Sequence, residues 1–259
     1  MSGTFVRADR RKVDQLRSVH IEYGVCGNAD ASVLFCMGNT KVLCTIVLQD
    51  GVPPFLRGKK EGWLTAEYSM LPASTHTRTV REAAVMKRSS RSLEISRLIG
   101  RSLRSVVDLT LLGERTIYID CDVIQADGGT RTAAITGTYC ALLHAVQNRW
   151  QHFLKKEFLK DSIAAVSVGW KEGVGLLDLD FEEDSSIDAD FNFVITGSGR
   201  IIEVQGTAEK VPLTWDAVAQ MYGLASVGVR QLFEQLGVSD MSSVAPAAGF
   251  KLGLTLAQR

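Results

Sequence analysis

The order of strand-like and helix-like segments constrains the fold of this chain more than any other feature of the sequence. β-Branched and aromatic residues fill residues 32–48 on both sides of Gly38-Asn39, which predicts a β-hairpin. Further strands are predicted at residues 63–71 and 115–124. Between these two strands, apolar residues recur at helical spacing from Ser90 to Asp108.

The second half of the chain repeats this order. An apolar helix is expected to start near Thr130, and it leads into a second cluster of strands and a final helix. The predicted strands cover residues 164–170, 174–181, 190–196 and 200–206, and the final helix covers residues 214–236. Strand clusters that are each followed by a helix predict a layered sandwich of the mixed α/β or α+β class.

Composition and charge exclude several classes of protein. The 29 Lys and Arg residues balance 29 Asp and Glu residues, so no overall field attracts a polyanion. The charged N-terminus does not resemble a signal peptide, and the uncharged run at 132–148 holds polar residues typical of a buried helix. Five cysteines without C-x-x-C spacing predict reduced thiols in the cytoplasm. The sequence has no G-x-G-x-x-G or P-loop motif, which argues against nucleotide-cofactor enzymes of those classes.

The charges are nevertheless segregated along the chain. Residues 57–104 hold eleven Lys and Arg residues and four acids, whereas residues 171–190 hold eight acids and one lysine. Either segment alone is compatible with an ordinary solvated face. Together they favour a basic surface that binds a polyanion beside a carboxylate cluster that holds a cation.

Two predicted helices begin with arginine. Asp127-Gly128-Gly129 forms a predicted turn, Thr130 is the predicted N-cap, and Arg131 then lies in the first turn. A positive charge there opposes the helix dipole, and residues 87–91 repeat the anomaly before the preceding helix. An anion bound at both N-termini explains this pattern, because free N–H groups and guanidinium groups bind phosphate together. Pairing of these arginines with surface acids is the alternative.

The acidic residues also follow a pattern. Strand alternation over residues 177–182 predicts Leu177, Leu179 and Phe181 on one face and Asp178, Asp180 and Glu182 on the other. A six-residue step is expected to bring Asp184 and Asp190 together at one end of a sheet. Clustered carboxylates repel each other unless a cation such as Mg²⁺ lies between them or one carboxylate binds a proton. A solvated acidic loop is the alternative.

Long motifs in these segments are similar to those of one enzyme family. They are GNTKVLCT (38–45), GWLTAEYSMLP (62–72), THTR (75–78), REAA (81–84), EISRLIGRSLR (94–104), DCDVIQADGGTRTAAITG (120–137), EDSSIDADFN (183–192) and EVQGTAE (203–209). From about Arg7 to Leu236 the chain resembles the ribonuclease PH family, phosphate-dependent 3′→5′ exoribonucleases that trim tRNA precursors in bacteria.

The resemblance implies a fold and an assembly. Members have the RNase PH fold, an α+β fold of two similar βαβα halves that is ribosomal protein S5 domain 2-like. We therefore expect a single catalytic domain at residues 1–240, built of two pseudo-repeated halves, and a flexible C-terminal tail at 241–259. The resemblance also implies a cytoplasmic homohexamer, a trimer of dimers, with neither a membrane nor DNA as a partner.

The resemblance further implies roles for eight residues. They are Arg91, Gly129, Thr130 and Arg131 for binding phosphate, Asp184 and Asp190 for catalysis and for holding Mg²⁺, and Arg78 and Arg81 for binding RNA. Ala73 stands where the family usually has an arginine that contacts RNA, and Ala31 and Cys36 replace the usual Gly and Glu as packing changes. Asn192 stands where the longer polynucleotide phosphorylases carry lysine, which favours ribonuclease PH.

The implied activity is phosphorolysis. Inorganic phosphate, the co-substrate, removes 3′-terminal nucleotides from tRNA precursors and other RNA 3′ ends as nucleoside 5′-diphosphates. The reverse reaction adds nucleotides, so the enzyme is also a tRNA nucleotidyltransferase. Two alternatives are a catalytically silent RNA-binding subunit of an exosome-like ring and a hydrolytic ribonuclease that uses water.

Overall fold

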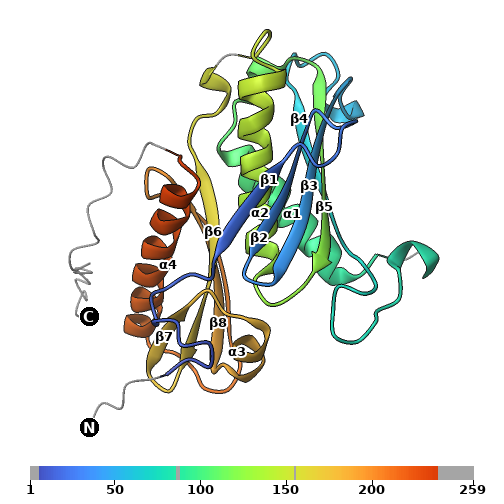
Figure 1. Cartoon of the computed structure of the whole chain (residues 1–259). Coiled ribbons are helices and arrows are strands. Elements are labelled where there is room, and N and C mark those ends of the chain that lie inside the picture. Colours follow the sequence, from blue (N-terminus) through green and yellow to red (C-terminus); the bar gives the residue numbers. More distant parts are fainter. Residues whose placement is uncertain (1–5, 86–87, 155, 239–259) are drawn as a thin grey trace, which may run out of the picture.

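Two β-sheets and four α-helices form the structure, a computed structural model that describes residues 6–85, 88–154 and 156–238 (Figure 1). The tail predicted at residues 241–259 lies outside the described residues. In the described part of the chain, no helix is long and apolar enough to cross a membrane. The α+β fold class predicted from the sequence is confirmed.

The first sheet has five strands in the order β1-β2-β3-β5-β4. Its strands are β1 (Val19–Tyr23), β2 (Ala31–Met37), β3 (Thr40–Asp50), β4 (Trp63–Met70) and β5 (Arg115–Gln125). The predicted hairpin is confirmed as β2 and β3, which pair antiparallel around Gly38 at a left-handed φ of 56°. β4 and β5 are parallel, and α1 (Ser90–Ser105) connects them, as a parallel pair requires.

The second sheet has four antiparallel strands in the order β7-β6-β8-β9. Its strands are β6 (Ile163–Lys171), β7 (Val174–Leu177), β8 (Ala189–Thr196) and β9 (Ile201–Ala208). The last helix, α4 (Trp215–Gln235), packs on β6 and β7, and Thr214 caps its N-terminus. The final helix predicted at residues 214–236 is confirmed.

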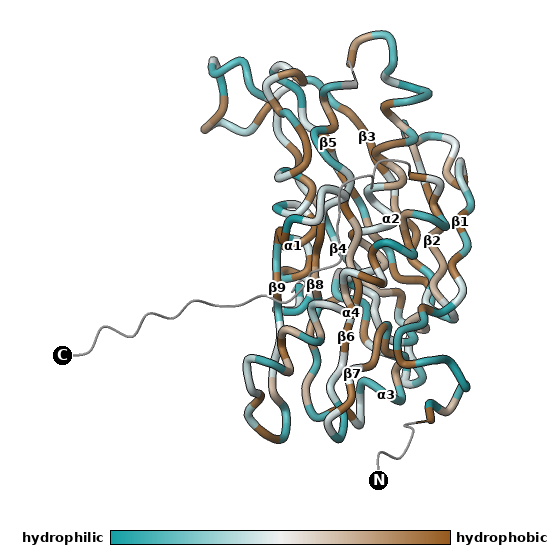
Figure 2. The backbone as a smooth tube through the Cα atoms, turned by 90° about the vertical axis from the view of Figure 1, so that its left-hand side faces the viewer, coloured by the Kyte–Doolittle hydropathy of each residue, from teal (hydrophilic) through white to brown (hydrophobic). Residues whose placement is uncertain are grey.

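The helix α2 (Thr130–His144) lies between the two sheets. It packs on β2 and β3 from one side and on β6 from the other, so nearly all of its residues are buried. In contrast, α1 alternates between brown and teal in Figure 2, because it buries one face on β4 and exposes the other. One continuous core, which includes Phe35, Ile135, Val166 and Phe233, therefore joins both halves of the chain.

Short turns complete the connections. They are the 3₁₀ turns η1 (Pro54–Leu56), η2 (Glu82–Val85), η3 (Leu109–Leu112) and η5 (Lys156–Phe158), and the π-helical turn η4 (Ala145–Arg149). α1 ends at Ser105, before the predicted Asp108, because Val107 leaves the helix to form a β-bridge with Leu159.

The strand predicted at residues 174–181 is wrong beyond Leu177. Asp180 accepts the backbone N–H of Glu183 and donates its own N–H to the Glu183 side chain, and this capping box starts α3 (Phe181–Ser186). The predicted alternation of faces therefore fails. Asp178 is fully buried, whereas half of the surface of Phe181 (50%) is exposed.

Candidate active site

An open pocket of about 1020 Å³ lies where the N-termini of α1 and α2 meet the second sheet. Six of the eight predicted site residues line it, namely Arg91, Gly129, Thr130, Arg131, Asp184 and Asp190. They come from α1, the start of α2, α3 and β8. The tertiary fold thus brings the two arginine-started helices and the acid pair into one site.

A double-glycine turn forms one wall of this pocket. Gly128 and Gly129 both have left-handed backbones, with φ of 74° and 64°. A Cβ atom on Gly128 would lie 2.5 Å from the carbonyl oxygen of Leu179, so only glycine lets the turn pack this closely. The turn therefore fixes where α2 begins.

The predicted N-cap was wrong by one residue. Gly129 is the N-cap of α2 and Thr130 is the first helical residue, because the hydroxyl of buried Thr130 lies 2.8 Å from the hydroxyl of Tyr68 instead of capping the helix. Gly129 has no side chain to accept the N–H groups of the first turn. These groups are therefore available to an anion, which the helix dipole also favours.

Each arginine is placed by its own helix. Ser89 caps α1 through a hydrogen bond from the Ser92 N–H, and this geometry directs the exposed Arg91 into the pocket. Arg131 donates from Nη1 to Oε1 of Gln205 at 3.0 Å, and the same nitrogen lies 3.6 Å from Oε1 of Glu94. These contacts hold Arg131 at the pocket wall, with only 19% of its side chain exposed.

The acid pair combines a short helix with a strand. Asp184 belongs to α3, and Asp190 lies on β8 opposite Gly169 and Thr207. Loss of surrounding water raises the pKa of Asp184, and the charge of Asp190 raises it further, whereas Arg91 and Arg131 lower it. Asp184 is thus suited to hold a proton at higher pH than an ordinary aspartate.

The two carboxylates also fit a magnesium ion. In the described residues, no group of three or more His, Cys, Asp or Glu side chains is arranged to hold a metal ion. Mg²⁺ commonly binds one or two carboxylates and completes its coordination with water and substrate phosphates. Two acids that repel each other in a pocket also lined by Arg91 and Arg131 match this donor set.

Replacing Asp184 with Asn is expected to raise the thermal midpoint at pH 7. A raised pKa means that Asp184 stabilises the fold when protonated and that this stability is lost as pH rises through the raised pKa. The gain should stay below about 1 kcal/mol because solvent screens this exposed group. It should shrink as the pH is lowered toward 4, because asparagine mimics the protonated acid. Thermal unfolding without phosphate, measured from pH 4 to pH 8, checks this; a variant less stable than wild type at pH 7 contradicts it.

The predicted RNA-binding arginines do not line this pocket. Arg78 and Arg81 are exposed and follow the loop that begins at Leu71. Ala73 and His76 of that loop line a second pocket of about 470 Å³, together with Phe181. The two predicted RNA-binding residues therefore lie outside the pocket that the other six predicted site residues line.

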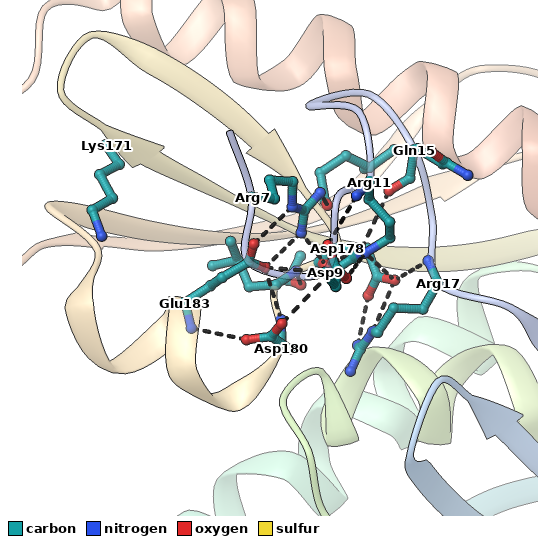
Figure 3. Close-up of polar contacts among 12 residues, drawn as sticks. Arg7, Asp9, Arg11, Gln15, Arg17, Lys171, Asp178, Asp180 and Glu183 are labelled. Atoms are coloured by element: carbon teal, nitrogen blue, oxygen red, sulfur yellow. Dashed lines mark hydrogen bonds and ion pairs between the residues drawn. The ribbon is translucent and has the colours of Figure 1, made fainter. Parts of the chain in front are cut away.

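Three arginines that contact acidic residues beside the pocket were not identified from the sequence. Arg7, Arg11 and Arg17 extend from the N-terminal segment toward Asp178, Asp180 and Glu183, as Figure 3 shows. Their only signal in the sequence is a cluster of arginines in one short stretch, and their acidic partners lie in the run read as a strand and loop.

Comparison with known proteins shows the family of this chain. Residues 15–147 match the family model for domain 1 of the 3′ exoribonuclease family, and residues 161–228 match the model for domain 2. This chain belongs to the ribonuclease PH family. It is 50% identical to a Ribonuclease PH of Bacillus pumilus, over 89% of this chain and 96% of that protein. It is 53% identical to a Ribonuclease PH of Neisseria meningitidis serogroup B, over 86% of this chain and 93% of that protein.

Solved structures share the fold at lower identity. An Archaeoglobus fulgidus exosome with RNA bound to the active site contains a chain with a TM-score of 0.75 at 20% identity, covering 89% of this chain and 92% of that one. An archaeal exosome core gives a TM-score of 0.71 at 20% identity, covering 90% and 91%. At this identity the match establishes the ribonuclease PH fold of this chain.

Proposed function

We propose that this chain is a phosphorolytic 3′→5′ exoribonuclease that acts on tRNA precursors and other RNA 3′ ends. The observation that carries the proposal is one pocket in which two arginines, the open N-terminus of α2 and two carboxylates meet. Inorganic phosphate attacks the last phosphodiester, and the bond to the 3′-oxygen breaks. The products are a nucleoside 5′-diphosphate and an RNA shorter by one nucleotide.

Arg91, Arg131 and the turn at Gly129 and Thr130 hold the attacking phosphate. Attack of one anion on another requires neutralisation of charge, which fixed guanidinium groups and N–H groups provide without reorganisation. The hydrogen bond from Arg131 to Gln205 and the packing of the glycine turn keep these donors in place. No covalent intermediate on the protein is required.

Asp184 and Asp190 act on the leaving group of the reaction. The raised pKa of Asp184 suits it to donate a proton to the departing 3′-oxygen. Asp190 faces it in the same pocket and helps to keep that proton bound. Asp184 and Asp190 would hold Mg²⁺, and the ion would supply neutralisation of the charge that develops on the phosphate oxygens.

Arg78 and Arg81 bind the 3′ end of the RNA. They are exposed, so they are free to pair with the phosphate backbone. Because phosphorolysis is nearly balanced in energy, the same site adds nucleotides from diphosphates, which is a tRNA nucleotidyltransferase activity. The domain at residues 1–240 works as one catalytic unit, since one core joins its halves.

The assembly that accompanies this function is a cytoplasmic homohexamer, a trimer of dimers. It is proposed on the family membership of the chain and on the likeness of its fold to exosome cores. Light scattering of the purified protein tests it: six times the chain mass of 28.3 kDa supports the ring, and the mass of a monomer overturns it.

Replacing Arg131 with Ala is expected to raise the apparent phosphate KM by about 10- to 150-fold, the loss of one charge-assisted contact of about 1.5–3 kcal/mol. The RNA KM should change little, because the proposed RNA-binding residues Arg78 and Arg81 lie outside this pocket. Initial rates at varied phosphate and fixed RNA measure the effect. Arg149→Ala is the matched control, since Arg149 is exposed and lies outside this pocket. A wild-type phosphate KM in Arg131→Ala would remove Arg131 from the site.

The proposed function is tested with a tRNA that carries extra 3′ nucleotides, incubated with the protein and Mg²⁺ with and without phosphate. Release that occurs only with phosphate supports it. Release of monophosphates without phosphate identifies a hydrolase instead. Binding of the RNA without release in either reaction identifies a catalytically silent subunit.

A further inference from the structure

The N-terminal segment, residues 7–17, connects the first half of the chain to the site in the second half. Figure 1 shows it in blue, beside β7 and α3, before the chain enters β1 of the first sheet. It contains no helix or strand, and Leu177 donates its N–H to the carbonyl oxygen of Val13 at 2.7 Å. Its position therefore depends on tertiary contacts, and its arginines provide them.

Arg17 ties the phosphate-binding turn to Asp178. Its Nε and Nη2 donate to Oδ2 and Oδ1 of Asp178 at 3.0 and 2.6 Å, and its backbone N–H donates to Oδ2 at 2.8 Å. Its third nitrogen, Nη1, donates to the carbonyl oxygen of Asp127, the residue before the double glycine. A Cβ on Gly129 would lie 3.0 Å from Nη2 of Arg17, so this guanidinium lies directly against the turn.

The burial and backbone conformation of Asp178 are consistent with a dedicated arginine partner. None of its surface is exposed, and it has a left-handed backbone with φ of 55°, which is costly for a residue other than glycine. A buried carboxylate requires a charged partner with matching hydrogen bonds, and the planar fork of arginine provides one that lysine cannot reproduce.

Arg7 makes the corresponding contacts with the short helix α3. Its side chain is 0% exposed, and it donates from Nε and Nη2 to both carboxylate oxygens of Glu183 at 2.7 and 2.5 Å. The remaining donor Nη1 binds the carbonyl oxygen of Leu177 at 2.7 Å. All three of its nitrogens thus join the end of β7 to α3.

The contact matters because α3 is short. A helix of six residues is not stable alone, so its direction is set by what holds it. Glu183 belongs to the capping box of α3, and Asp184 is the next residue. A fixed Glu183 therefore aims Asp184 into the pocket.

From these contacts we propose that Arg7 and Arg17 are positioning residues with separable effects on the reaction. Arg17, through Asp178 and Asp127, sets the turn that binds phosphate. Arg7, through Glu183, sets the orientation of Asp184. This inference rests on the proposed phosphorolytic function and adds how the two parts of the site are held.

Kinetics of Arg7→Lys and Arg17→Lys tests the separation, with Arg10→Lys as the matched control because Arg10 is exposed on the same segment. Arg17→Lys should raise the phosphate KM about 10-fold or more and leave kcat close to wild type, because misplacement of binding donors by about 1 Å is costly. Arg7→Lys should lower kcat about 10-fold or more and leave the phosphate KM close to wild type.

A second readout is independent of turnover. Phosphate should raise the thermal midpoint of the wild type and of Arg7→Lys by similar amounts, and that of Arg17→Lys by much less at the same phosphate concentration. If a lysine variant does not fold, Asp178→Asn replaces Arg17→Lys and Glu183→Gln replaces Arg7→Lys, since each keeps the shape of the partner side chain.

Three results overturn the proposal. Equal losses of kcat in both variants, in proportion to the folded fraction, would mean that the arginines only stabilise the fold. A wild-type phosphate KM and phosphate response in Arg17→Lys, with an active wild type, would overturn the positioning role alone. A wild type without phosphate-dependent release would overturn the proposed function and this inference together.

Discussion

Asp190→Asn should lower kcat for phosphorolysis by about 10³-fold or more, since it removes a carboxylate that organises proton transfer and phosphate neutralisation. RNA binding should remain close to wild type, because the arginines that bind the RNA backbone are untouched. Asparagine keeps the shape of the side chain, so β8 and its pairing with β6 and β9 should persist.

Single-turnover rates and RNA binding by fluorescence anisotropy measure the two effects separately. Asp216→Asn is the matched control, because Asp216 is exposed in the first turn of α4 and lies outside the pocket. Turnover near the wild-type rate in Asp190→Asn would leave the acid pair without a catalytic role.

Arg17→Met should have the largest effect on stability. It leaves the Asp178 carboxylate buried without its main partner, a change that typically costs about 3–5 kcal/mol. In a domain of this size, about 1 kcal/mol corresponds to roughly 2–4 °C, so the thermal midpoint should fall by about 6–20 °C. Methionine keeps much of the apolar volume, so loss of the ion pair is the main change.

Thermal unfolding followed by circular dichroism measures this effect, with Arg10→Met as the control on the same segment. The control should unfold within about 2 °C of wild type, as expected for an exposed residue. An equally small change in Arg17→Met would show that the buried pair contributes little to stability and that its bonds are replaced by others.

The sequence was sufficient to predict those parts of the site that depend on local signals. The glycine turn, the arginine in the first turn of α2 and the acid pair each follow directly from residue type and spacing. The long helices α1, α2 and α4 and most strands were also predicted, because their apolar periodicity is set by burial of one face or, in α2, of nearly all faces. The short helix α3 was not predicted.

The rest of the site depends on contacts between distant residues. Arg17 and Asp178 are 161 positions apart, and Arg7 and Glu183 are 176 apart, so no local pattern connects them. Alternation of Asp178 with Leu177 and Leu179 predicts a strand with Asp178 on its acidic face. The capping box at Asp180 and Glu183 overrides that pattern and starts a helix.

In the proposed reaction, phosphate itself breaks the RNA chain. The most direct test is to incubate the protein with Mg²⁺, an RNA with a free 3′ end and radiolabelled inorganic phosphate, and to locate the label in the released nucleotides. Phosphorolysis predicts nucleoside diphosphates with the label only in the β-phosphate, and little label in the Arg131→Ala reaction at low phosphate. Unlabelled nucleoside monophosphates would contradict the account and show that water is the nucleophile.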